Sequence, residues 1–274
     1  MNDRRLANVA LLYSNRRTAD GIYSMELLSP EIASTARPGQ FLMVALGEGA
    51  NAFLRRPFSL AGIDKATGMV RLIYQVAGKG TELMATWGTG RQIDVLGPLG
   101  NGFPLGEGAG TAENVILVGG GMGLAPLLPL AKALREQSKT VNVFAGARSI
   151  DLLFELSAFK EYGCEVQIAT EDGSAGVTGF ATIPLERHLQ KLQAFDLTAQ
   201  TLYACGPMPF LKAVAGMCRP YGLEAYLSME ERMGCGIGAC MGCSIRIRAS
   251  EGIIQKRVCY DGPVFPALEV VFDG

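Results

Sequence analysis

The cysteines near the C-terminal end constrain this chain more than any other feature of its sequence. Cys235, Cys240 and Cys243 form a C-x4-C-x2-C run, and Cys259 follows after fifteen further residues. This is the plant-type ligand spacing for a [2Fe-2S] cluster, in which one tight loop supplies three thiolates and a returning strand supplies the fourth. The spacing therefore predicts an iron-sulfur module at the end of a longer chain.

The loop that carries the first three cysteines reads GCGIGACMGC. Its glycines let the backbone curl closely around inorganic sulfide and aim N–H groups at it. A structural zinc would also accept four thiolates, but zinc ribbons usually present two C-x2-C knuckles, whereas Cys259 stands alone. The spacing favours the cluster over zinc. Cys164 and Cys218 lie in helix-like stretches and are expected to be small buried hydrophobes.

Composition and charge argue against several classes of function. The 274 residues are 49% hydrophobic and carry a net charge of -1, with no run of Lys and Arg that would neutralise nucleic acid. Residues 1–5 lack the apolar segment of a signal peptide, and seven cysteines suit a reducing compartment, so a cytoplasmic protein is expected. The uncharged run 114–132 contains several Gly and Pro and predicts a strand, a turn and a helix rather than a membrane span.

The rhythm of apolar residues divides the chain into three parts. Residues 1–105 show short alternating stretches typical of an antiparallel barrel. After a Gly-rich linker at 106–110, residues 111–224 alternate strand-like and helix-like stretches, which predicts a doubly wound parallel sheet. Residues 225–274 are too few to form a stable hydrophobic core without a metal site or another cross-link, and they form the predicted cluster domain.

A glycine-rich turn follows the first strand of the middle part, in the segment NVILVGGGMGLAPLLPL. Such a turn aims free N–H groups and a helix N-terminus at a diphosphate. Leu124 occupies the place of the third glycine of the standard pattern, so a tight turn that binds nothing stays open as an alternative. Arg148, Ser149 and Asp151 follow the next predicted strand, where the adenosine ribose would bind. An arginine there favours the 2′-phosphate of NADP and an acid favours the free 2′-hydroxyl of NAD. Because both are present, the sequence does not choose between NADP and NAD.

Three motifs in the first part add to this pattern. Leu54 to Ser59 places two arginines beside a proline-fixed strand, which by composition alone suits a solvated edge strand. Gly78-Lys79-Gly80-Thr81 precedes a helical stretch and suits a phosphate, and residues 97–102 form a second irregular glycine turn.

These motifs in this order, followed by GGGMGLAPL and CGPMPFL, resemble the ferredoxin-reductase superfamily, whose members have an FAD-binding barrel followed by a pyridine-nucleotide domain. The C-terminal MEERMGCGIGACMGC and VCYDGPVF are similar, more narrowly, to the electron-transfer subunits of class 1B dihydroorotate dehydrogenase. The resemblance covers essentially the whole chain.

The resemblance implies which residues bind each cofactor. The flavin would be bound by Arg56, Pro57, Phe58 and Ser59, by Ile73, Tyr74 and Gln75, and by Gly80 and Thr81 at the FAD diphosphate. NAD would be bound by Gly119, Gly120, Gly121, Met122 and Gly123, with Cys205, Gly206 and Pro207 beside the nicotinamide. The cluster would be held by Cys235, Cys240, Cys243 and Cys259.

The resemblance further implies an oxidoreductase subunit of pyrimidine biosynthesis. Electrons would come from an FMN-containing subunit that oxidises dihydroorotate to orotate, in a heterotetramer of two copies of each, and pass through the cluster and FAD to NAD. The alternative is a reductase subunit of another NAD(P)H-dependent system, of the ferredoxin:NADP oxidoreductase or sulfide dehydrogenase type. The single histidine, His188, lies in a polar helical stretch and is expected to be a solvated surface residue.

Overall fold

The computed structural model describes residues 7–47, 53–106, 110–192 and 199–272. Its first part is a closed antiparallel barrel with the strand order β1-β2-β5-β4-β3-β6. The alternation in β1 shows why: Ala10 and Leu12 point into the barrel core while their neighbours face outward. The barrel consists of β1 (Ala7–Ala19), β2 (Ile22–Leu28), α1 (Pro30–Thr35), β3 (Phe41–Val44), β4 (Arg56–Asp64), β5 (Met69–Gln75), α2 (Lys79–Ala85) and β6 (Gln92–Leu99).

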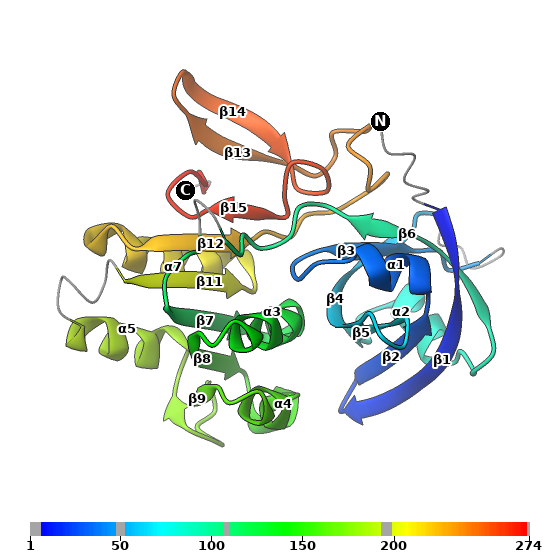
Figure 1. Ribbon diagram of the computed structural model, residues 1–274, viewed down its shortest axis with the longest axis horizontal. Helices are drawn as coiled ribbons and strands as arrows, with labels where there is room; N and C mark the ends of the chain where they lie inside the picture. Colours follow the sequence, from blue (N-terminus) through cyan, green and yellow to red (C-terminus); the bar gives the residue numbers. More distant parts are fainter. Residues whose placement is uncertain (1–6, 48–52, 107–109, 193–198, 273–274) are drawn as a thin grey trace.

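The middle part is a seven-stranded sheet in the order β10-β9-β8-β7-β11-β12-β15, with helices on both faces (Figure 1). Helices α3 and α4 share a core with one face, and α5 and α7 with the other. Its elements are β7 (Asn114–Gly120), η1 (Gly121–Gly123), α3 (Leu124–Glu136), β8 (Thr140–Ala147), η2 (Ile150–Leu152), α4 (Leu156–Glu161), β9 (Glu165–Thr170), β10 (Val177–Thr178), α5 (Thr182–Lys191), β11 (Gln200–Cys205), α7 (Met208–Cys218), η3 (Arg219–Tyr221), β12 (Glu224–Ser228) and β15 (Val264–Pro266).

The C-terminal part is attached to this sheet rather than standing apart from it. β13 (Ser244–Ala249) and β14 (Gly252–Arg257) form a separate hairpin, whereas β15 returns to pair antiparallel with β12. The cysteine loop runs between β12 and β13, on the side of the sheet that faces the barrel (Figure 1).

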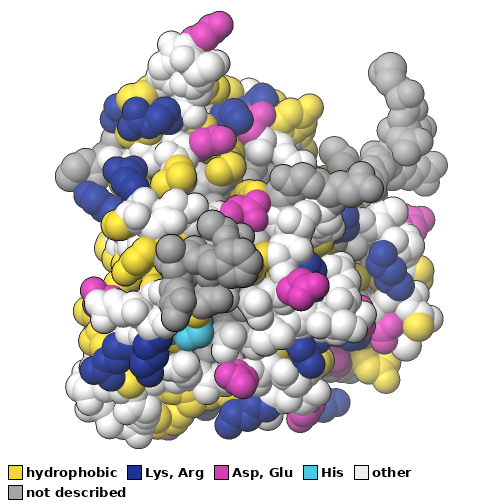
Figure 2. All heavy atoms as spheres, turned by 60° about the vertical axis from the view of Figure 1, so that its left-hand side comes forward, with side chains coloured by type: hydrophobic (Ala, Val, Ile, Leu, Met, Phe, Trp, Pro, Cys, Tyr) yellow, Lys and Arg dark blue, Asp and Glu magenta, His cyan; other side chains and the backbone are white. Residues whose placement is uncertain are grey.

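The predicted barrel and doubly wound sheet are confirmed, and the run 114–132 forms β7, η1 and most of α3. Residues 1–5 and 107–109, where the N-terminal segment and most of the linker were predicted, lie outside the described residues. In the part of the chain that the structure describes, no helix is both long enough and apolar enough to cross a bilayer. The face in Figure 2 carries interspersed acidic and basic side chains.

Two shared cores join the three parts. On one side, Ile22, Ala61 and Ile73 of the barrel lie in the same apolar cluster as α3, and Arg71 on β5 pairs with Glu155 before α4 at 3.0 Å. On the other side, Phe41, Met43 and Leu99 of the barrel share a core with Cys243 and Cys259. The barrel is therefore in direct contact with both the sheet domain and the cysteine-bearing module.

The prediction for His188 was only partly right, because its side chain is half-buried rather than fully solvated. Its imidazole packs against the Phe144 ring with centroids 5.3 Å apart, and its Nε2 atom is buried and finds no hydrogen-bond partner among the residues that the structure describes. Burial lowers the pKa of this imidazole. The polar residues around His188 lie on the outer face of α5, and the helical turn carries the histidine toward the sheet.

Candidate functional site: the cysteine loop and the cofactor-binding segments

The four predicted ligand cysteines form two adjacent pairs. The thiols of Cys235 and Cys240 lie within hydrogen-bonding reach of each other, and so do those of Cys243 and Cys259. Backbone N–H groups point at the sulfurs as well: that of Cys240 at Cys235 Sγ and that of Cys259 at Cys243 Sγ, each at 3.4 Å. Both donors are cysteine N–H groups and both acceptors are cysteine sulfurs. That the loop glycines aim N–H groups at inorganic sulfide stays a prediction.

This pairing fits a two-iron cluster better than a single metal ion. A [2Fe-2S] cluster needs two thiolates on each of two irons, which matches two neighbouring pairs, whereas structural zinc needs four donors around one centre. The donor arrangement therefore favours the cluster over zinc.

Electrostatics differ between the pairs. Burial alone would raise the pKa of the Cys235 thiol, but hydrogen bonds from the backbone N–H groups of Cys240, Ile237 and Ala239 outweigh it and lower the pKa to about 6. At Cys259, burial and the neighbouring Cys243 raise the pKa to about 12. Cys240 is exposed while Cys243 and Cys259 are buried, so one edge of the site reaches the surface.

Two of the loop glycines are required by the backbone itself. Gly236 and Gly238 have φ angles of 72° and 82°, in the left-handed region. A Cβ atom on Gly236 would lie 2.6 Å from Met43 Cγ, and one on Gly238 would lie 2.8 Å from the Cβ atom of Tyr260. Gly236 therefore lets the loop approach the barrel, and Gly238 lets it approach the segment that carries Cys259.

The irregular turn at residues 97–102 also joins the barrel to the cysteine module. The Asn101 backbone N–H donates to the Gly262 carbonyl at 2.6 Å, and Asn101 Nδ2 donates to the Asp261 carbonyl at 3.1 Å. A cavity of about 500 Å³ beside this turn is lined by Gly236, Cys259 and Tyr260 among others. The turn holds the cysteine module against the barrel.

The predicted flavin segment on β4 is half-buried, and one of its arginines lies against the start of α2. Arg56 to Ser59 all have intermediate exposure. A Cβ atom on Gly80 would lie 3.6 Å from Arg56 Nε, so these two predicted residues come together in space. The side chain of Thr81 is already engaged, because its hydroxyl accepts the Ala77 N–H at 2.9 Å and donates to the Gly78 carbonyl at 3.0 Å.

The second predicted flavin segment, on β5, divides between two sides of the strand. Tyr74 points into the barrel, stacks on Tyr23 at 5.5 Å and donates to Asn15 Oδ1 at 3.0 Å; burial raises its pKa to about 12. Ile73 packs toward α3, and Gln75 is exposed. Because side chains alternate along a strand, these three residues do not share one face.

The predicted NAD loop lies where β7 meets α3. A Cβ atom on Gly119 would lie 2.4 Å from Leu124 Cδ2, and one on Gly123 would lie 2.1 Å from the Cys205 carbonyl oxygen. These two glycines allow close packing of strand, helix and loop. Gly121 has a φ of 54° and open space around it. Met122, half-buried, packs beside the α3 core.

Cys205 ends β11 between Gly119 of β7 and Ser228 of β12. Its thiol is buried. Burial is the main cause that raises the pKa of this thiol, and the nearby Glu230 carboxyl raises it further. A neutral thiol at this position is a small polarisable group rather than a nucleophile. Gly206 and Pro207 follow and lead into α7.

A cavity of about 310 Å³ opens at the carboxyl ends of β7, β8, β9 and β11. Two predicted residues, Gly120 and Pro207, line it. So do Glu171, Phe180 and Phe210, which were not among the residues predicted from the sequence. The position of Glu171 directly after the third strand of the sheet was the signal that could have identified it, because ligands of such sheets bind at carboxyl ends of strands. Arg148 and Asp151 are not among the lining residues.

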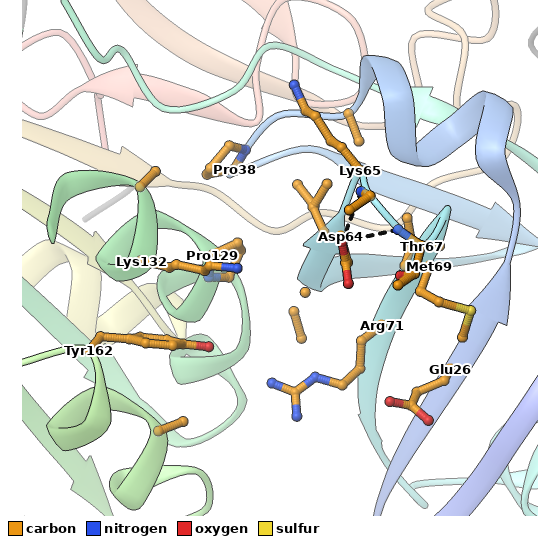
Figure 3. A pocket seen from close by; sticks show the side chains of 18 of the residues that line it. Glu26, Pro38, Asp64, Lys65, Thr67, Met69, Arg71, Pro129, Lys132 and Tyr162 are labelled. Atoms are coloured by element: carbon orange, nitrogen blue, oxygen red, sulfur yellow. Dashed lines mark hydrogen bonds between the residues drawn. The ribbon is translucent and has the colours of Figure 1, made fainter. Parts of the chain in front are cut away.

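A larger cavity, of about 830 Å³, separates the β4–β5 hairpin from α3 and α4 (Figure 3). Arg71 and Glu26 point into it from the barrel and Lys132 from α3, while Asp64 accepts hydrogen bonds from the turn at Thr67. None of the residues predicted for FAD, NAD or the cluster lines this cavity.

Comparison with known proteins agrees with this arrangement. Residues 230–271 match the family described as the iron-sulfur cluster binding domain of dihydroorotate dehydrogenase B. Proteins named dihydroorotate dehydrogenase B (NAD(+)), electron transfer subunit, are 43% identical in Geobacillus thermodenitrificans, over 94% of this chain and 96% of that relative, and 45% identical in Geobacillus sp. WCH70, over 92% and 94%.

Two solved structures have the same fold as this chain. An NADH-dependent reduced ferredoxin-NADP oxidoreductase superposes with a TM-score of 0.82 at 31% identity, covering 96% of this chain and 90% of that one. Phthalate dioxygenase reductase superposes with a TM-score of 0.64 at 21% identity, covering 92% and 77%. On the identity and coverage of the relatives in Geobacillus, this chain belongs to the family of dihydroorotate dehydrogenase B (NAD+) electron transfer subunits.

Proposed function

We propose that this chain takes electrons from an FMN-containing subunit that oxidises dihydroorotate to orotate and delivers them to NAD+, in a heterotetramer of two copies of each subunit. The single observation that carries the proposal is the pairing of Cys235 with Cys240 and of Cys243 with Cys259, in a module packed against the barrel. When bound, the cluster supplies single-electron transfer and FAD supplies exchange between single electrons and a hydride.

The residues of the chain bind, orient and shield these groups. The four cysteines would hold the cluster, and the backbone N–H groups of Cys240 and Cys259 would stabilise charge on the thiolates next to them. Arg56, beside Gly80, would neutralise charge on the FAD diphosphate. The turn at Asn101 would keep the cluster end of the module against the barrel, so that both cofactors stay at a fixed separation.

The glycine loop and Cys205 would form the nicotinamide side of the site. Close packing of Gly123 on the Cys205 carbonyl leaves no room for a side chain there. The buried, protonated thiol of Cys205 would exclude water without competing for the hydride. We also propose that the FAD and NAD residues implied by the resemblance bind these cofactors, and that the domains meet at residues 105 and 111 and at residues 224 and 225.

The surface beside Cys240 suits the docking of a partner subunit. Ile237, Met241 and Tyr260 are exposed by 45%, 47% and 59% respectively, next to the most exposed of the four cysteines. Exposed apolar side chains grouped at one edge are typical of protein interfaces. We infer that the FMN-containing subunit contacts this edge.

The proposal is tested by purifying the chain anaerobically with the dihydroorotate-oxidising subunit encoded in the same genome. Dihydroorotate should reduce NAD+ only when both subunits are present, and the complex should sediment with the mass of two copies of each. Rapid reduction of NAD+ by reduced ferredoxin, with none by the dihydroorotate-oxidising subunit, would contradict it.

That outcome would favour the second candidate, a reductase subunit of another NAD(P)H-dependent system. Its support is the likeness at 31% identity to an NADH-dependent reduced ferredoxin-NADP oxidoreductase. The two candidates share the cluster, the barrel and the nucleotide site, and they differ in the protein that exchanges electrons with the cluster.

A further inference from the structure

The barrel is attached to the sheet domain at several places across the sheet. In the strand order, β11, β12 and β15 lie on one side of β7, and β8 and β9 lie on the other. On the first side, the Tyr203 hydroxyl donates to the Pro104 carbonyl at 2.6 Å, just after the barrel ends. Near β15, the Asn101 N–H donates to the Gly262 carbonyl at 2.6 Å. The barrel is therefore held by hydrogen bonds at the β11–β15 side of the sheet.

At the middle of the sheet, the contact between the two domains is apolar. Ile22, Ala61 and Ile73 of the barrel share a core with α3, the helix that follows β7. Apolar attraction has no preferred direction. This contact therefore resists separation of the barrel from the sheet domain more strongly than it resists a small rotation of one against the other.

On the other side of β7, an ion pair crosses from the barrel to the sheet domain. Arg71 Nη1 of β5 lies 3.0 Å from Glu155 Oε1, and the two side chains are only 24% and 19% exposed. Glu155 directly precedes α4, which packs beside β9. Arg71 reaches toward α3 and α4 across the cavity of about 830 Å³ (Figure 3). Because this directional contact lies opposite the hydrogen-bonded side, it is placed to fix the angle between the two domains.

The backbone at both ends of the ion pair is adapted to the contact. A Cβ atom on Gly62 would lie 3.0 Å from Arg71 Cβ and 3.3 Å from Arg71 Nε, so this glycine lets the arginine lie against β4. The pairing of β4 with β5 shifts register between Leu60 and Gly62, and such bulges re-aim side chains. Glu155 has a φ of 58°, a left-handed conformation that persists only where the surrounding structure holds it.

We propose that Arg71 and Glu155 are positioning residues for hydride transfer between nicotinamide and flavin. Neither is among the residues predicted to bind a cofactor, and none of those residues lines the cavity beside the pair. By fixing the angle between barrel and sheet domain, the pair sets the separation of the two reacting rings. A misplacement of about 1 Å, caused far from the reacting atoms, can slow a reaction about a hundredfold. The role of the pair rests on the proposed exchange of a hydride between FAD and NAD.

The test follows flavin reduction by NADH in the isolated, fully loaded chain by rapid mixing over a range of NADH concentrations. One hydride leaves NADH, which becomes NAD+, and converts oxidised FAD to its anionic reduced form. Glu155→Gln keeps the shape of the side chain and removes its charge. The limiting rate should fall at least about tenfold, while the half-saturating NADH concentration changes less than about twofold. A primary isotope effect with 4,4-dideuterated NADH should identify the slowed step as hydride transfer.

Two further variants separate positioning from a general loss of stability. Arg71→Glu combined with Glu155→Arg reverses the ion pair and should recover most of the limiting rate. Lys132→Met is the matched control, because Lys132 lines the same cavity but lies 4.0 Å from Glu136 of its own helix. Removing this charge should leave the limiting rate unchanged.

An unchanged limiting rate in Glu155→Gln would overturn the positioning role. So would an equal loss of rate in Lys132→Met, or a reversed pair that reacts as slowly as Glu155→Gln. Failure of the proposed function gives a different result, in which NADH does not reduce the flavin of the wild-type chain at all. No partner subunit takes part in the assay, so the result does not depend on which protein exchanges electrons with the cluster.

Discussion

Arg257 donates from Nη1 to the Gly238 carbonyl oxygen at 2.8 Å and thereby ties the cysteine loop to the strand that leads to Cys259. The same guanidinium donates from Nε to Asp261 Oδ2 at 2.9 Å and lies 4.6 Å from the centre of the Tyr260 ring. The loop that contains Gly238 carries three of the four cysteines, and the segment that follows Arg257 carries the fourth. Arg257 is therefore placed to hold both halves of the cluster site in register.

Replacing Arg257 by Met keeps most of the side-chain length and removes these hydrogen bonds. Because these charge-assisted hydrogen bonds hold the loop to the segment that carries Cys259, the Arg257→Met chain should lose iron to a chelator at least about tenfold faster than the wild-type chain. Loss of iron is followed by the bleaching of visible absorbance. Arg248→Met, at an exposed position on β13, is the matched control, and equal rates of loss in the two variants would rule out this role for Arg257.

The two kinds of loop glycine should respond differently to substitution. Gly238 has a φ of 82° and no space for a Cβ atom, whereas a Cβ atom on Gly234 would only reach van der Waals contact with Cys240 Sγ at 3.4 Å. Gly238→Ala should therefore lower the free energy of unfolding of the loaded protein by about 1–3 kcal/mol, from backbone strain plus the clash. Gly234→Ala should change it by less than about 1 kcal/mol. Denaturant unfolding followed by visible absorbance measures both.

His188 should make the stability of the protein depend on pH. Burial lowers the pKa of the folded imidazole below its ordinary value of 6.5, so the unfolded chain binds the proton more readily. The stabilisation is complete above about pH 6.5 and is lost as pH falls from there through the lower folded pKa. His188→Phe keeps the ring contact with Phe144 and removes the titration. As the pH falls below about 6.5, the free energy of unfolding of the wild-type chain should decrease relative to that of the variant. A difference between the two chains that does not change with pH would exclude this effect.

Two of the apolar side chains beside Cys240 should stabilise the association of this chain with the FMN-containing subunit. Ile237→Asp and Met241→Asp place a charge in the inferred interface and should weaken association with the FMN-containing subunit by about tenfold or more. Flavin reduction by NADH in the isolated chain should stay unchanged. Val9→Asp, at an exposed position on the outer face of β1, is the control and should leave association unaffected. If only the Val9 variant associates weakly, the interface lies on the barrel instead.

The sequence predicted those parts of the fold that local patterns determine. Three patterns can be recognised from residues that are near one another in the sequence. They are the alternation of apolar and polar residues in the first part, the strand-turn-helix pattern at residues 114–136, and the cysteine spacing. What it missed depends on contacts between distant segments. The pairing of β15 with β12, the link from Asn101 to Asp261 and the position of Glu171 in a cavity are set by packing. The contact of His188 with Phe144 was missed for the same reason, because Phe144 lies on another element.

The central claim is that four cysteines of this chain hold a [2Fe-2S] cluster that exchanges electrons with a flavin and NAD. Its most direct test is the visible spectrum of anaerobically purified protein, with iron, sulfide and flavin determined on the same sample, before and after adding NADH. The expected result is about two irons, two sulfides and one FAD per chain, with absorbance bleached by NADH. A colourless protein that contains zinc would contradict the claim.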